Sequence, residues 1–161
     1  MTLMLIVTSL LQAAMPDSAA WKERHFPDLP IVPACTFARP AKEVRSPHDL
    51  PEQVRMEVVR FFESGGGLAD ADGMFNSTDV IDAENVPHRR FLRAYLIDNV
   101  WLIWWEMGGH AHGVNTLALI RRHQAGGGPP LYSAVPGSIF TGNVCAGSEA
   151  FLAGARAAPG F

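Results

Sequence analysis

The pattern of hydrophobic and polar residues predicts one amphipathic helix in the first half of the chain. Apolar residues with the spacing of one helical face occur at Val54, Val58, Phe61 and Phe62. Asp49 and Glu52 have capping-box spacing just before this stripe, so Asp49 is the expected N-cap. Gly65 to Gly67 follow it and favour termination. We therefore predict a helix from Asp49 to Ser64.

Three runs rich in β-branched and aromatic residues follow in the second half. They extend from Phe91 to Ile97, from Val100 to Glu106 and from Val114 to Arg121. Asp98-Asn99 and Gly108-Gly109 separate the runs as hairpin turns would. This arrangement predicts a meander of three antiparallel strands.

The middle run is apolar on both of its faces. One face would carry Val100, Leu102 and Trp104, and the other would carry Trp101, Ile103 and Trp105. A strand of this kind is expected at the centre of the sheet, covered on both sides. The tryptophans are therefore predicted to be core residues and not a stacking platform for bases or sugars.

The remaining segments carry weaker signals. Six prolines between Pro27 and Pro51 predict an irregular segment that wraps the surface. Residues 68 to 90 are polar and predict a long loop, with at most a short strand around Val80 and Ile81. Near the end of the chain, a short helix is expected from Glu149 to Ala157.

The first fourteen residues, Met1 to Ala14, form an apolar run. It is shorter than the roughly 20 residues that a membrane-spanning helix needs, and no basic residue precedes it. An amphipathic or buried first helix is favoured, while an atypical signal, or residues upstream of a true start at Met15, remain open. Residues 1–48 would thus be an N-terminal helix and a wrapping segment within a single α+β domain of residues 1–161.

Composition excludes some classes of function. The chain has 161 residues, of which 13 are basic and 16 acidic, and a net charge of −3. It has no basic excess for binding nucleic acid. The two cysteines, Cys35 and Cys145, lack CxxC spacing and are too few for a disulfide framework, so a reducing compartment and a cytoplasmic location are expected.

Cys145 is the strongest candidate for chemistry. Small residues surround it, and a helix beginning beside it would favour the thiolate, which is the nucleophilic form. The alternative is a small buried cysteine, which is a common fate of free cysteine.

The residues around Cys145 resemble the active-site segment of the ubiquitin-conjugating-enzyme family. The matching positions are Pro136, Gly142, Val144 and Cys145. The sequences Leu131-Tyr132-Ser133-Ala134 and Gly142-Asn143-Val144-Cys145-Ala146-Gly147 are similar to the bacterial branch that is encoded beside ubiquitin-like conjugation proteins. The resemblance covers roughly Phe91 to Ser148. Val135 and Gly137 stand where the family has His and Asn.

This resemblance implies a ubiquitin-conjugating-like fold and acyl transfer through a thioester, in the bacterial cytoplasm and in antiviral defence. Cys145 would accept a ubiquitin-like protein from an activating enzyme and pass it to an amine. Asn143, or the backbone amides near Gly147 and Ser148, would stabilise the oxyanion. No cofactor, metal, nucleic acid or membrane is expected.

Three alternatives remain open. The first is a non-catalytic protein-interaction domain of the same fold, in which Cys145 only packs. The second is a zinc hydrolase built on the His110-Ala-His112 pair with Glu106 or His123, although the serine and aspartate typical of JAB-type metallopeptidases are absent from the following stretch. The third pairs Cys145 with one of these histidines as a hydrolase.

Overall fold

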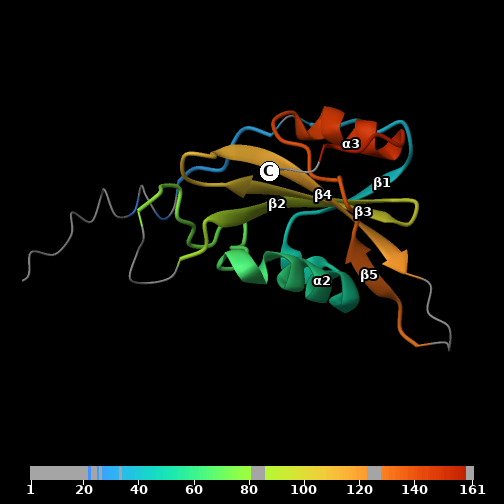
Figure 1. Cartoon of the computed structure of the whole chain (residues 1–161), viewed down its shortest axis with the longest axis horizontal. Helices are drawn as coiled ribbons and strands as arrows, with labels where there is room; N and C mark the ends of the chain where they lie inside the picture. Colours follow the sequence, from blue (N-terminus) through green and yellow to red (C-terminus); the bar gives the residue numbers. More distant parts are fainter. Residues whose placement is uncertain are drawn as a thin grey trace, which may run out of the picture.

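An antiparallel sheet of five strands, with strands in the same order as in the chain, forms the centre of the fold. The computed structural model describes Lys22, His25 and residues 27–32, 34–80, 86–122 and 128–158. Figure 1 shows the sheet between two helices, α2 below it and α3 above it. The predicted α+β class is therefore confirmed, while the predicted first helix, at residues 1–14, lies outside the described residues.

The three predicted strands are present with nearly the expected bounds. The sheet consists of β1 (Ala41–Val44), β2 (Arg89–Ile97), β3 (Val100–Met107), β4 (Gly113–Arg122) and β5 (Leu131–Ala134). The predicted meander corresponds to β2, β3 and β4. The described part of the predicted loop 68–90 contains the first residues of β2. It also contains Ala69, which forms an isolated β-bridge with Arg90 of β2.

The two outer strands were missed by the sequence analysis. β1 lies inside the proline-rich segment that was predicted to be irregular, in a stretch without proline after Pro40. It pairs with β2 alone, and proline is tolerated next to such an edge strand. β5 forms the opposite edge and pairs with β4. Each outer strand is four residues long, too short for a clear alternation of apolar and polar residues.

Both faces of β3 are buried, as predicted. Trp101, Ile103 and Trp105 pack in the cluster that includes α2. Leu102 and Trp104 pack in a second cluster that includes α3. The Trp104 indole N–H also donates to the Ser148 hydroxyl of α3 at 2.9 Å, so its one polar atom is satisfied inside the core.

Helix α2 (Glu52–Phe62) buries Val54, Val58 and Phe62 against the sheet. The prediction that Asp49 caps this helix is wrong. Asp49 belongs to a separate short 3-10 turn, Pro47–Asp49, which Ser46 caps, and Pro51 occupies the position before α2. The expected end is confirmed, because Gly66 adopts a left-handed backbone (φ 80°) after the helix.

Helix α3 (Val144–Leu152) begins five residues earlier than predicted. Gly147 suggested a flexible segment, but it lies inside the helix against Phe140. A Cβ atom at Gly147 would come within 2.7 Å of the Phe140 Cβ atom. The glycine is therefore explained by close packing, and Asn143 caps the helix. Neither α2 nor α3 is long and apolar enough to cross a bilayer, and this holds for every helix in the described residues.

A buried ion pair connects β2 and β3. Arg90 of β2 and Glu106 of β3 lie opposite each other in the register, and their side chains are 2% and 5% exposed. The Arg90 guanidinium also donates to the carbonyl oxygens of Pro27 (2.6 Å) and Asp28 (2.9 Å). It therefore joins the sheet to the N-terminal segment.

Candidate functional site

Cys145 lies in the first turn of α3. Asn143 precedes the helix with extended backbone, and its side-chain oxygen accepts a hydrogen bond from the Ala146 N–H at 3.0 Å. This cap defines the start of α3 and satisfies one of the free amides of its first turn. Cys145 was expected in a loop that leads into a helix beginning at Glu149, and the structure places it inside the helix instead.

Cys145 forms a disulfide with Cys35. Their Cα atoms are 5.5 Å apart, although 110 positions separate the two residues in the sequence. The expectation that the cysteines are unpaired is therefore wrong, and with it the main reason for expecting a cytoplasmic location. Because the Cys145 sulfur is already bonded, it has no thiolate with which to attack a carbonyl in this state.

The disulfide fastens residues 34–39 onto α3 and the sheet. The Phe37 ring contacts Tyr95 edge to face, with centroids 5.0 Å apart. The Ala38 N–H donates to Glu149 of α3 at 3.2 Å, and the Arg39 guanidinium pairs with Asp98 at 2.7 Å. The covalent link is thus one of several contacts that hold this segment in place.

Asn143 is beside Cys145 but is used as a helix cap. Its side-chain oxygen faces the Ala146 amide, as a capping residue requires. An oxyanion donor would instead have to present the side-chain NH₂ group to a substrate carbonyl. The role of Asn143 in catalysis, like that of Cys145, stays a prediction that requires the reduced protein.

The histidines proposed as a zinc pair contact different acids. His110 Nδ1 pairs with Asp79. His112 Nε2 lies 2.9 Å from the carboxylate of Glu106, the residue that also binds Arg90. His123 lies outside the described residues. Across the parts of the chain that the structure describes, no group of three or more His, Cys, Asp or Glu residues could hold a metal.

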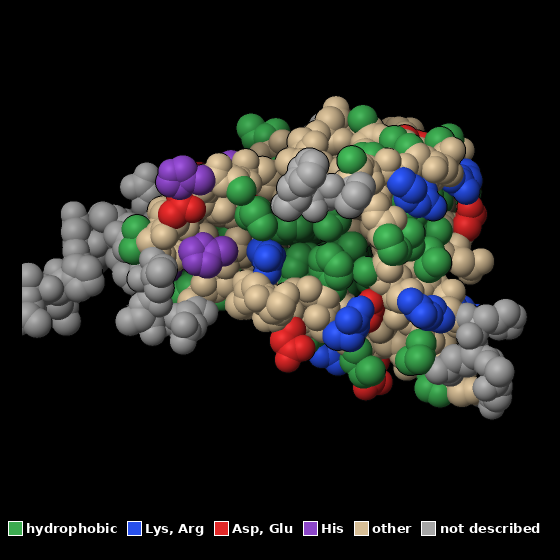
Figure 2. Space-filling view, viewed as in Figure 1, with side chains coloured by type: hydrophobic (Ala, Val, Ile, Leu, Met, Phe, Trp, Pro, Cys, Tyr) green, Lys and Arg blue, Asp and Glu red, His purple; other side chains and the backbone are tan. Residues whose placement is uncertain are grey.

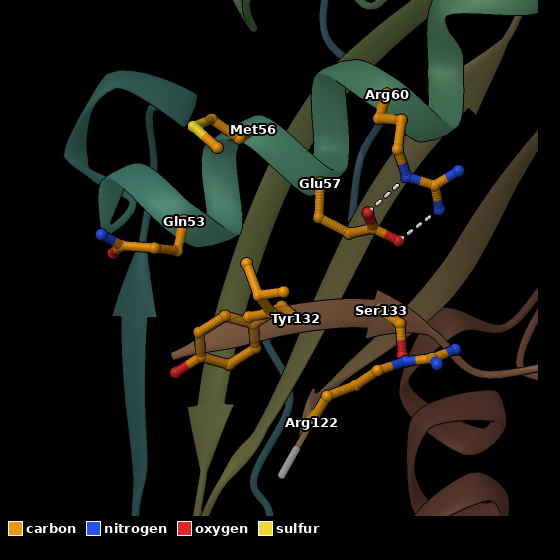
Figure 3. A pocket seen from close by; sticks show the side chains of 8 residues that line it. Gln53, Met56, Glu57, Arg60, Arg122, Tyr132 and Ser133 are labelled. Carbon is orange, nitrogen blue, oxygen red and sulfur yellow. Dashed lines mark hydrogen bonds and ion pairs between the residues drawn. The ribbon is translucent and has the colours of Figure 1, made fainter. Parts of the chain in front are cut away.

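A cleft of about 650 Å³ lies between α2 and β5. Figure 3 shows Glu57 and Arg60 on the helix side, with Tyr132, Ser133 and Arg122 on the sheet side. This site was not predicted, because the apolar stripe of the helix indicated only that the helix packs on the sheet. The available signal was the Glu57 to Arg60 spacing, which places opposite charges on one face of a helix.

Glu57 connects the two walls of the cleft. Its carboxylate binds the Arg60 guanidinium through two contacts of 2.6 Å, drawn as dashed lines in Figure 3. It also accepts the Ala134 N–H of β5 at 2.9 Å. The hydrogen bonds from Arg60 lower the pKa of Glu57 below its ordinary value; burial opposes this shift, and the Ala134 N–H adds to it.

Glu57→Gln is expected to lower the free energy of unfolding by about 1 to 2 kcal/mol at neutral pH, because the charged hydrogen bonds are lost. The folded pKa of Glu57 is lowered, so its contribution is complete above the unfolded pKa and is lost as the pH falls through the folded pKa. Urea unfolding at a series of pH values should show the two proteins converging in acid. Glu63→Gln, an exposed change just beyond α2, is the control and should change little. A constant difference down to low pH would contradict the expectation.

Comparison with protein-family models, curated proteins and solved structures gives no match. Function is therefore inferred from the residues and contacts of this chain alone.

Proposed function

We propose that the chain is a non-catalytic protein-binding domain in which the Cys35–Cys145 disulfide is structural. The observation that supports this is the bond itself, which occupies the sulfur that a thioester carrier would need. The surrounding contacts of Phe37, Ala38 and Arg39 favour a permanent fastening over a transient one. The cleft between α2 and β5 supplies a surface on which a partner can bind.

A structural disulfide also bears on the compartment. Such bonds persist in oxidising environments and are rare where glutathione and thioredoxin keep thiols reduced. We therefore propose that this domain works in an oxidising compartment, in place of the cytoplasmic location expected from its two cysteines.

Maleimide labelling of the unreduced protein, released from cells under acid quench, tests whether the two cysteines are bonded in the cell. We expect that neither cysteine is labelled.

The second candidate is the ubiquitin-conjugating-like carrier, and the position of Cys145 favours it. The residue is partly exposed in the first turn of α3, where the helix dipole favours a thiolate. A meander preceded by a helix is compatible with the fold of that family. After reduction, the Cys145 thiolate would attack the thioester of a ubiquitin-like protein and release the activating enzyme's thiol, so one thioester forms as another breaks.

The two functions differ in the reactivity of Cys145. Ubiquitin bearing a C-terminal mercaptoethanesulfonate thioester is the probe, since it needs no cognate activating enzyme. Cys35→Ser leaves only Cys145, and Cys145→Ser leaves only Cys35. We expect the two variants to form adducts at similar slow rates, as two unremarkable thiols would.

An adduct that forms tenfold or more faster on Cys145 than on Cys35 would overturn the binding-domain proposal and support the carrier. Circular dichroism of both variants before the reaction shows whether they are equally folded. A denatured sample of each variant gives the intrinsic rate of an exposed thiol for comparison.

A further inference from the structure

The open edge of β5 borders the cleft between α2 and β5. The Val135 N–H donates to Ala118 of β4 at 2.9 Å. Because N–H directions alternate along a strand, the Ser133 and Leu131 groups also face β4, and those of Tyr132 and Ala134 point away from the sheet. Glu57 already accepts the Ala134 N–H. Within the described residues, the Tyr132 N–H and C=O therefore remain available for pairing.

The cleft carries positive charge on a chain whose net charge is negative. Its lining contains Arg60, Arg122 and one acid, Glu57. Arg122 is exposed and forms no ion pair with any residue in the described ranges. Figure 2 shows basic and acidic side chains interspersed along the lower edge of this face, where α2 and β5 meet. A carboxylate would be favoured here.

Exposed apolar side chains lie beside these charges. Met56 on α2 is 54% exposed, and Leu131 on β5 is 43% exposed. Both line the cleft, together with the partly buried Tyr132. A ligand for this cleft should therefore combine an acidic group with an apolar one and should expose backbone groups for pairing with Tyr132.

We infer that the cleft binds an extended acidic segment of a partner protein, which adds a short strand to the edge of β5. This inference rests on the proposed protein-binding function. The segment pairs with the N–H and C=O of Tyr132, as in other cases of strand addition to a sheet edge. One side-chain carboxylate binds Arg122, and an apolar side chain packs on Met56 and Leu131.

Glu57 limits where the added strand ends. Its carboxylate covers the Ala134 N–H, so pairing cannot continue past Tyr132 in that direction. The bound segment is therefore short, and charge complementarity with Arg122 carries much of its specificity. Exposed ion pairs weaken with salt, so binding is salt-dependent.

The test is selection from a phage-displayed library of short random peptides on the oxidised full chain, followed by affinity measurement with the selected synthetic peptides. We expect the selected sequences to contain Asp or Glu next to an apolar residue. Arg122→Glu should weaken binding at least tenfold, which is about 1.4 kcal/mol. Arg121→Glu makes the same charge change at the preceding residue of β4, which does not line the cleft, and this variant should bind like the wild type.

N-methylation of the peptide amides tests the strand pairing without altering the protein. Methylation at the amide that meets Tyr132 should abolish binding, and methylation at the next amide should not.

The inference is overturned if no peptide is selected, if the peptides lack acids, or if both arginine variants bind equally. It is also overturned if light scattering shows a dimer that Arg122→Glu dissociates, because a second copy would then occupy the edge. The reactivity of Cys145 with the ubiquitin thioester is measured in a separate experiment. A failure of peptide binding can therefore be told apart from a failure of the proposed protein-binding function.

Discussion

Replacing Cys35 with serine is expected to lower the free energy of unfolding by about 2 to 5 kcal/mol. The disulfide closes a loop between residues that are 110 positions apart. In the chain-entropy account, a covalently closed loop of that length strongly reduces the conformational entropy of the unfolded chain. Removal of the disulfide restores this entropy and so stabilises the unfolded state. The native state loses the covalent attachment of residues 34–39 to α3 as well.

Urea unfolding followed by tryptophan fluorescence measures this effect, since Trp104 contacts Phe37 in the fastened segment. Cys145→Ser and the reduced wild type should unfold at about the same urea concentration as Cys35→Ser, and the double variant should show no additional loss. This non-additivity is the signature of one shared bond. If reductant leaves the wild-type transition unchanged, the bond is absent in solution and the structural role proposed for it is wrong.

The disulfide also determines which function the two cysteines allow. A thiol in the first turn of α3 has the environment that lowers thiol pKa values in reactive cysteines. The same position, bonded to Cys35, is inert until reduced. Stability and the proposed carrier function therefore compete for one sulfur atom, and the size of the stability loss on reduction indicates which use the fold supports.

Helices and strands with a repeated apolar pattern could be predicted from the sequence. Strands that form only because a neighbouring strand pairs with them could not. The stripe of Val54, Val58 and Phe62 and the two apolar faces of β3 are repeated signals within one segment. β1 and β5 have four residues each and become strands because β2 and β4 offer them a partner. The bounds of α3 depend on Gly147, whose fit against Phe140 is visible only in three dimensions.

The sites differ in the same way. A helix close to Cys145 was predicted, but its start was placed five residues too late to include this residue. The bond to Cys35 could not be predicted, because residues so far apart in the sequence meet only through the fold. The role of Glu57 depends on β5, which was not predicted. The pairing of Arg90 with Glu106 could not be predicted either, because the hairpin register set by the Asp98-Asn99 turn places Glu106 opposite Phe91. A register shift between Phe91 and Arg93 brings Arg90 opposite Glu106.

Arg90→Met is expected to lower the free energy of unfolding by about 3 to 5 kcal/mol. The substitution leaves the Glu106 carboxylate buried without its guanidinium partner, and it removes the donors that bind Pro27 and Asp28. The carboxylate keeps a contact with His112, which does not replace the two hydrogen bonds from Arg90. The cost arises from an uncompensated buried charge.

The matched control is Arg93→Met on the same strand. Arg93 is 29% exposed and lies 3.8 Å from Glu43, so its loss should cost at most about 1 kcal/mol.

Adding Glu106→Leu to Arg90→Met should recover part of the lost stability, because the unpaired charge is removed. A purely steric role for Arg90 would give no recovery. Equal losses for Arg90→Met and Arg93→Met in urea unfolding would contradict the buried ion pair. Recovery in the double variant would identify electrostatics, and not packing, as the reason that these two charged residues are buried in the sheet.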